Sequence, residues 1–195
     1  PDYGFSRWIN IETKYGGRYL PENDTYAKQT VAHNTLVVDG ISQNSGNRKK
    51  ADKVHANRHF FDASDPDIQV MSASSADHYD DIEMQRTMFL VTDSRLDYPV
   101  VVDIYRIEAD KKHRYDMPIH YKGHLMNTNF EYATESKLLK PMGKQYGYQH
   151  LWKTASAKVS NDAVVTWLDG QRYYSYITDV PGKAEFIFGK IGAND

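Results

Sequence analysis

The chain has 195 residues, of which 40% are apolar and 13% aromatic, and it contains no cysteine. This length and composition predict one sizeable hydrophobic core, and they exclude a disordered chain, a disulfide framework and a thiolate metal site. The net charge of −2 supplies no basic surface for nucleic acid, and the apolar runs are too short to span a bilayer. We therefore expect a globular protein that binds neither nucleic acid nor membrane. The sequence gives no indication of the oligomeric state.

Strand signals follow one another along almost the whole chain. The candidate stretches are short, rich in β-branched and aromatic residues, and bounded by turn dipeptides such as Asp39-Gly40 and Asp169-Gly170. No stretch carries an apolar stripe with a period of 3.6 residues over three turns, which argues against long helices. The predicted fold is all-β, an antiparallel two-layer β-sandwich. The predicted strands are 30–39, 55–63, 69–74, 86–92, 100–108, 119–122, 151–158, 163–168, 172–178 and 184–190.

The first of these stretches contains an unusual pair of residues. His33 and Asn34 interrupt an otherwise apolar run in "YAKQTVAHNTLVVDG". Residues 1–35 contain further polar and aromatic side chains, among them Asp2, Arg7 and Tyr19, as expected at the rim of a binding site. A single histidine in a strand is more often a hydrogen-bonded packing residue than a ligand, and Asp2 with His33 forms no metal motif by spacing alone. Both interpretations of His33 stay open on the residues themselves.

Four segments together resemble a known family. "DYGFSRWIN", "GGRYLPEN", "YAKQTVAHNTLVVDG" and "QRTMFLV…YPVVVDIYRI" resemble the heparinase II/III-like polysaccharide lyases, and within them the oligoalginate lyases of polysaccharide lyase family 17. Such enzymes have an N-terminal (α/α) toroid followed by stacked antiparallel sheets, a supersandwich-like region, with the active site between the two parts. The first residues, "PDYGFSRWIN", include no initiator Met and are typical of the interior of a domain. The resemblance therefore implies that residues 1–195 are the single β-sandwich domain of a larger lyase, with the toroid as its partner.

The resemblance also implies a metal site. In this family a metal, usually zinc, is bound by a histidine of an upstream His-x-His segment, by the aspartate of a "D-x-G" stretch and by the histidine of "HNT". The last two correspond to Asp2 and His33 in this chain. Zinc needs about four donors, so these two residues alone form an incomplete site. We expect the zinc to be structural and weakly held by this chain.

The implied reaction is β-elimination on 1,4-linked uronates, with exolytic cleavage of alginate oligosaccharides. A base must remove the C5 proton and an acid must protonate the departing O4, and tyrosine suits both tasks. The family pattern places a catalytic tyrosine in "GGRYLPEN", which is Tyr19 here, and Arg7 is a candidate contact to a uronate carboxylate. The remaining catalytic groups belong to the toroid, so we expect the chain alone to be inactive. The family resemblance further implies a periplasmic or secreted bacterial enzyme.

Two alternatives remain. One is a glycosaminoglycan lyase of the heparin or heparan type, which shares the scaffold and the chemistry. The other is a non-catalytic carbohydrate-binding β-sandwich that uses Trp152, Tyr173 and Tyr174 as a sugar platform. Buried aromatic residues of a sandwich core would give the same sequence pattern.

Overall fold

The computed structural model describes residues 20–136, 139–180 and 182–192. It divides the chain into two compact units: unit 1 comprises Pro1–Gly40 and Asp116–Asp195, and unit 2 comprises Ile41–Tyr115. The expectation that residues 1–195 form a single domain stays a prediction.

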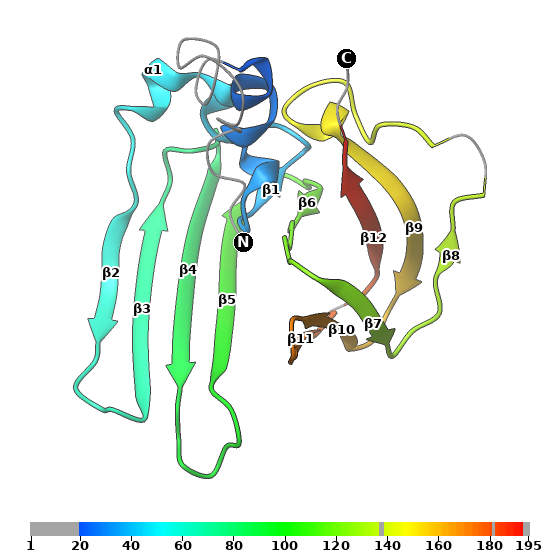
Figure 1. The fold of residues 1–195 in the computed structure, drawn as a ribbon. Coiled ribbons are helices and arrows are strands. Elements are labelled where there is room, and N and C mark those ends of the chain that lie inside the picture. Colours follow the sequence, from blue (N-terminus) through cyan, green and yellow to red (C-terminus); the bar gives the residue numbers. More distant parts are fainter. Residues whose placement is uncertain (1–19, 137–138, 181, 193–195) are drawn as a thin grey trace. The chain divides into compact units, whose positions relative to one another are not determined.

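Unit 2 is built around a four-stranded antiparallel sheet, in which every strand pairs with its neighbour in the sequence (Figure 1). Its longest ladder joins β4 to β5, from Ile82 opposite Ala109 to Val91 opposite Val100. A helical turn, α1, precedes the sheet, and Asn47 caps it by accepting a hydrogen bond from the Lys50 N–H at 3.1 Å. The elements are η5 (Gln43–Gly46), α1 (Arg48–Ala51), β2 (Asn57–Asp62), β3 (Ile68–Ser75), β4 (Ile82–Val91) and β5 (Val100–Ala109).

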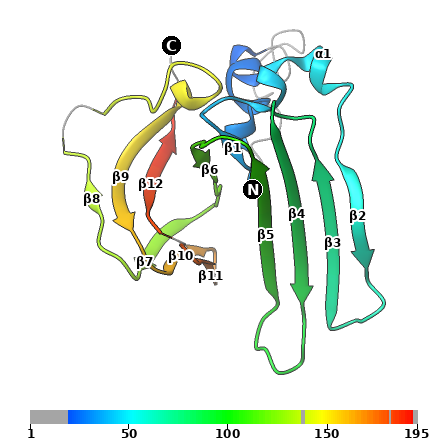
Figure 2. The same cartoon turned by 180° about the vertical axis from the view of Figure 1, so that it is seen from behind.

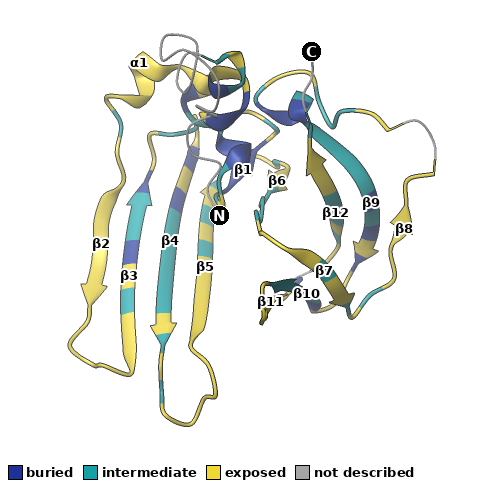
Figure 3. Ribbon diagram, in the orientation of Figure 1, coloured by how far each residue is buried: buried dark blue, intermediate teal, exposed yellow. Residues whose placement is uncertain are grey.

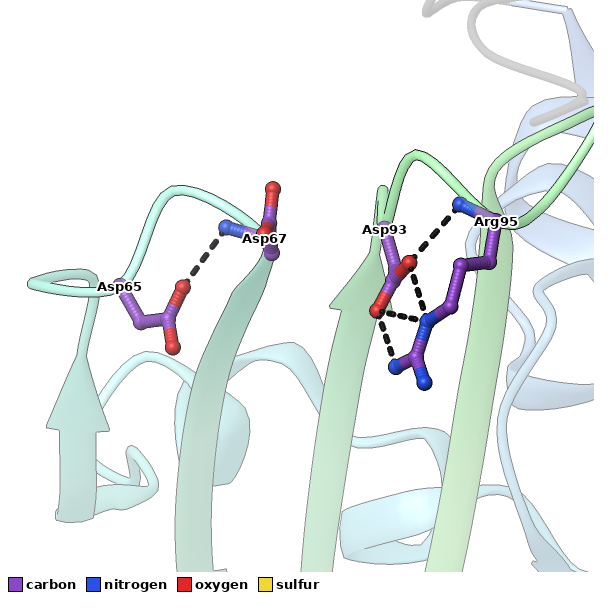
Figure 4. A network of polar contacts seen from close by, with 4 residues as sticks. All are labelled: Asp65, Asp67, Asp93 and Arg95. Carbon is purple, nitrogen blue, oxygen red and sulfur yellow. Dashed lines mark hydrogen bonds and ion pairs between the residues drawn. The ribbon is translucent and has the colours of Figure 1, made fainter.

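Aspartates shape the loops at one end of this sheet (Figure 4). Asp65 accepts a hydrogen bond from the Asp67 N–H at 2.8 Å, and Asp93 accepts one from the Arg95 N–H at 2.8 Å. Such contacts are the Asx turns that favour aspartate in tight loops. The Arg95 guanidinium also donates to Asp93, and these hydrogen bonds hold the pKa of the Asp93 carboxyl below its ordinary value. The polar side chains here are therefore explained by loop conformation.

Unit 1 contains two three-stranded antiparallel sheets, one in the order β11-β10-β7 and the other in the order β12-β9-β8 (Figures 1 and 2). The two-residue strand β1, three short helical turns and the two-residue strand β6, whose Tyr115 belongs to unit 2, complete the described elements. These elements are η3 (Asn23–Ala27), η4 (Thr30–Ala32), β1 (Val37–Val38), β6 (Tyr115–Asp116), β7 (His124–Thr128), β8 (Ala133–Thr134), η6 (Tyr148–His150), β9 (Leu151–Val159), β10 (Ala163–Asp169), β11 (Arg172–Thr178) and β12 (Ala184–Ile191).

A small apolar core connects the two sheets of unit 1. Ala157 and Val159 of β9 pack with Ala163 at the start of β10 and with Val180, and Ala163 is fully buried. Phe130, from the connection between β7 and β8, packs beside this core with its ring 5.0 Å from that of Phe186 on β12. Sheets that share apolar side chains in this way form two layers, as in a sandwich.

The predicted fold class is confirmed: the described residues are mostly strands in antiparallel sheets, with short helical elements and no long helix. None of the helices in the described part is long and apolar enough to cross a membrane. Eight predicted strands correspond to observed ones, and the predicted bounds of β11 match those of the structure. The correspondence is closest where a strand pairs with a sequence neighbour.

Two predicted strands are wrong. Residues 30–39 form the 3₁₀ turn η4, a loop and the two-residue strand β1. Thr30, Val31 and Ala32 are all buried in succession, which a half-exposed strand with alternating faces does not allow. Residues 119–122 lie in a loop, where the His120 N–H donates to the Asn34 side chain and not to a neighbouring strand. Strand β7, which follows this loop, was not predicted.

Candidate functional site

The site that the sequence predicts lies in unit 1, and the structure describes part of it. Asp2, Arg7 and Tyr19 fall outside the described residues, so their predicted roles stay predictions. His33 is described, together with the chain that leads to it from Leu20. Among the described residues there is no group of three or more histidine, cysteine, aspartate or glutamate side chains that could bind a metal.

His33 follows η4 and is half-buried. Its Nε2 lies 3.0 Å from the carbonyl oxygen of Ala27. A carbonyl oxygen can only accept, so Nε2 carries a proton and donates it to Ala27. Histidine ligands of metals commonly donate their second N–H to a backbone carbonyl, which fixes the tautomer and the ring orientation. The contact with Ala27 is compatible with a metal-binding role for His33, which stays a prediction.

Asn34 connects the turn around His33 to a distant loop. Its Oδ1 accepts a hydrogen bond from the His120 N–H at 2.7 Å, and the His120 ring donates from Nε2 to the Val31 carbonyl at 2.8 Å. Two hydrogen bonds thus join residues 31–34 to a residue 86 positions further along the chain. The interruption of the apolar run by a carboxamide is explained by this contact.

A second distant segment, Gly147 to His150, packs against residues 25–31. Gly147 has a φ of +89°, and a Cβ atom there would lie 2.6 Å from Val31 Cγ1 and 3.1 Å from Gln29 Cβ. Such a distance is below van der Waals contact, so glycine is required by both conformation and space. The Gln149 side chain donates from Nε2 to the Thr25 carbonyl at 3.1 Å. We call Gly147–His150 the clamp segment.

The clamp segment also contributes to a buried cluster. Tyr26, Val31, Ala32 and Val37 pack with Tyr148, whose hydroxyl donates to Asp116 Oδ2 at 2.5 Å. Each of these five side chains is at most 6% exposed. The backbone that carries His33 is therefore fixed by packing as well as by hydrogen bonds.

Sequence reasoning missed His120, Gly147 and His150. His120 lay in a predicted strand, and no motif marked the other two. A glycine followed by a run of aromatic and amide residues, "GYQH", is the only local signal that could have identified the clamp segment. The contacts that give these residues their importance are made with positions 86 to 125 residues away.

The structure does not assemble the predicted sugar platform. Trp152 lies on β9, whereas Tyr173 and Tyr174 lie on β11, which belongs to the other sheet of unit 1. As neighbours on one strand, Tyr173 and Tyr174 point to opposite faces. Tyr174 stacks on Trp167, the residue opposite it on β10, with the ring centroids 5.8 Å apart. The prediction that these three residues form one platform is therefore wrong.

Unit 2 contains a shallow pocket of about 400 Å³, whose polar lining is acidic. The lining carboxylates are those of Asp81, Glu83, Glu108 and Asp110. Lys111 lies 3.7 Å from Asp81, and Arg106 pairs with Glu108. A concentration of negative charge repels an anionic ligand, so this pocket does not suit a uronate.

Comparison with known proteins identifies the relatives of the chain. Residues 1–175 match the family described as heparinase II/III-like, C-terminal. The whole chain is 41% identical, over 198 residues, to an exo-oligoalginate lyase of Saccharophagus degradans, of which it covers 27%. It is also 41% identical, over 195 residues, to an alginate lyase of Stenotrophomonas maltophilia, of which it covers 26%. The resemblance seen in the four sequence segments is confirmed, and the chain spans about a quarter of the length of these curated relatives.

Proposed function

Because the chain belongs to the heparinase II/III-like, C-terminal family, we propose that it is the β-sheet part of a lyase that cleaves alginate oligosaccharides exolytically by β-elimination. The observation that carries this proposal is the 41% identity to an exo-oligoalginate lyase along the entire chain. The partner would be an N-terminal (α/α) toroid of the same protein, for which the greater length of the relatives leaves room. The enzyme would act in the periplasm or outside the cell.

Tyr19 is the proposed proton-transfer residue. The C5 proton of a uronate becomes acidic enough to remove only when the adjacent carboxylate is neutralised by donors or cations. Arg7 would supply one such contact, since its guanidinium matches a carboxylate in charge and geometry. A phenol held beside cationic groups has a lowered pKa and can then exchange a proton with the substrate.

Asp2 and His33 are the proposed zinc ligands of this chain, completed by a histidine of the toroid side. The support within the structure is the ring of His33, whose Nε2–H is directed to the Ala27 carbonyl. The zinc would be structural and would hold the start of the chain against the turn that carries His33. Substitution of His33 by alanine should then lower the zinc content of the purified protein, measured by atomic emission, below that of the parent.

The test of the reaction uses the full-length parent enzyme and oligoalginate, with heparan sulfate as the competing substrate. Elimination produces an unsaturated uronate that absorbs in the ultraviolet. We expect this signal with oligoalginate, and release of monomeric product from the earliest times if cleavage is exolytic. A rate that is higher with heparan sulfate would instead support the glycosaminoglycan lyase alternative.

The role of Tyr19 is tested by Tyr19→Phe in the same enzyme. We expect kcat to fall by at least about a hundredfold, since the substitution removes one phenolic proton. Tyr173→Phe is the matched control, because Tyr173 is 66% exposed on β11, and it should keep the parent rate. A Tyr19→Phe enzyme as fast as the control would remove Tyr19 from the mechanism.

A further inference from the structure

Three aromatic side chains form a row across the β11-β10-β7 sheet of unit 1. Tyr174 of β11 lies directly opposite Trp167 on the central strand β10, and their ring centroids are 5.8 Å apart at an interplanar angle of 16°. Tyr121, from the loop that leads into β7, has its ring centroid 5.1 Å from that of Trp167 at 37°. We call these three residues the aromatic row. Neither Trp152 nor Tyr173 belongs to it, so it is not the platform that the sequence predicted.

The backbone at Gly123 determines where Tyr121 lies. A Cβ atom at Gly123 would lie 2.0 Å from the Leu168 carbonyl oxygen, so only glycine allows the loop to approach β10 so closely. Leu168 directly follows Trp167 on β10. This close approach of the loop to β10 allows the rings of Tyr121 and Trp167 to meet.

The two outer members of the aromatic row are exposed. Tyr121 is 36% and Tyr174 44% exposed, whereas Ala163 and Val165 at the other end of β10 are buried. Strand β11 is at the edge of its sheet, and no strand of the described part pairs with its outer side (Figure 1). Packing of the core therefore does not account for these rings, and exposed aromatic groups that lie together mark a binding surface.

The cationic side chains beside the aromatic row suit an acidic ligand. Arg172 precedes Tyr174 by two residues and so lies on the same face of β11, and Lys122 follows Tyr121 in the loop. Both cations are exposed, and neither forms an ion pair with another described residue, although Asp169 lies opposite Arg172. The positive charges are therefore available to a carboxylate of a ligand.

The Tyr121 hydroxyl adds a hydrogen-bond donor to this surface. Burial, and to a smaller extent the nearby Tyr132, raises the pKa of the Tyr121 phenol above its ordinary value. The phenol therefore stays protonated at neutral pH and can donate, whereas a phenolate would repel an anion.

We propose that the aromatic row, with Arg172, is a second binding surface for acidic oligosaccharides, and that it includes none of the residues proposed for the reaction. A pyranose ring has an apolar C–H face, which can pack on the exposed part of the Tyr174 ring, and hydroxyl groups that can accept from Tyr121. Arg172 pairs with a uronate carboxylate. The choice of alginate as the ligand rests on the proposed function. Such a surface keeps the polymer near the enzyme and raises the local concentration of its chain ends.

The test is native electrophoresis of the full-length enzyme in gels that contain polymeric alginate, with turnover of a short oligoalginate measured in parallel. The apparent Kd obtained from the retardation should increase about fivefold for Tyr174→Ala and about threefold for Arg172→Gln. Tyr174→Phe keeps the ring and should keep the parent Kd. In all three variants kcat and KM for the short substrate should equal those of the parent, because these residues take no part in the proposed reaction.

Tyr173→Ala is the matched control, because Tyr173 is 66% exposed on the same strand and points to the opposite face. It should keep the parent Kd. The Tm of each variant shows whether it is folded, and Arg172→Gln changes only an exposed side chain, so it decides the question if Tyr174→Ala is unstable. A parent Kd in Arg172→Gln or in folded Tyr174→Ala, or an equal increase in Tyr173→Ala, would overturn the inference.

A gel that contains the neutral polymer hydroxyethylcellulose tests the class of sugar. We expect little retardation there, and retardation as strong as in alginate would overturn the assignment to an acidic ligand. An enzyme that cleaves oligoalginate, but whose Tyr174→Ala variant binds alginate like the parent, would overturn the inference alone. An enzyme that does not cleave oligoalginate, but shows retardation by alginate that depends on Tyr174, would overturn the proposed function and support the inference.

Discussion

Two regions of the chain are stabilised in different ways. Residues 20–38 of unit 1 have little regular secondary structure, and their side chains and carbonyls are bound by residues 86 to 125 positions away. The β2–β5 sheet of unit 2 depends on ladders between strands that follow one another, and Figure 3 shows β5 exposed along most of its length. The conformation of residues 20–38 thus depends on a few specific distant contacts, whereas the sheet depends on many similar local ones. A single substitution should therefore disturb the first region more than the second.

The largest effect is expected from Gly147→Ala in the clamp segment. The new Cβ would lie 2.6 Å from Val31 Cγ1 at a φ of +89°, so both backbone strain and overpacking result. We expect a loss of about 3 kcal/mol in the free energy of unfolding, measured by denaturant titration. Gly170→Ala on the β10–β11 turn is the control, because its φ is +62° and an added Cβ would meet no atom within 4 Å. Gly170→Ala should lower the free energy of unfolding by about 1 kcal/mol. Equal losses in the two variants would show that the close contact between residue 147 and Val31 is unimportant.

A smaller effect is expected from Arg86→Met in the sheet. Arg86 forms a two-point contact with Asp103 at 2.7 and 2.9 Å and lies over the Tyr105 ring, and both partners of the ion pair are about 70% buried. We expect a loss of about 1 kcal/mol in the free energy of unfolding, since one carboxylate loses its partner in a partly desolvated place. Arg95→Met removes the pair with Asp93, in which the Arg95 side chain is 86% exposed and that of Asp93 is 20% exposed, and it should cause a smaller loss. If Arg95→Met lowered the free energy of unfolding more than Arg86→Met, the ion pair in the loop would contribute more to stability than the ion pair between the strands.

The smallest effect is a pH dependence that arises in unit 2. Burial lowers the pKa of His78, an effect that the nearby Asp77 opposes, and Asn44 lies 3.3 Å from the His78 Nδ1. Because the unfolded chain binds the proton more tightly than the folded one, stability should decrease as the pH falls below about 6.5 and level off below the folded pKa. Denaturant titrations of the parent between pH 7.5 and about 5 should show this slope, and His78→Gln should reduce it. Identical slopes in the two proteins would assign the dependence to another group.

The same contrast explains how far the sequence predicted the structure. Strand β11 was predicted with its observed bounds, because alternation and the Asp169-Gly170 turn are local signals. Residues 30–39 were predicted as a strand from the same kind of signal, and there the contacts with His120 and the clamp segment determine the conformation instead. His33 was identified as a candidate because it interrupts an apolar run within a recognisable motif. His120 and His150 were not, since nothing in their own neighbourhood indicates which distant carbonyl or hydroxyl they bind.

The hydrogen bond between Thr25 and His150 spans 125 residues and sets an order of events during synthesis. At about 5–20 residues per second, roughly 6–25 seconds pass between the synthesis of its two ends. The four strands of unit 2 lie between those ends, and each pairs with its sequence neighbour, so the sheet can form in the meantime. The buried side chains of residues 20–38, including Tyr26 and Val31, can pack only after Gly147 and Tyr148 have been synthesised. In a nascent chain, residues 20–38 therefore stay exposed until the segment around His150 has been synthesised. A chaperone that binds exposed apolar segments would act on these residues during that time.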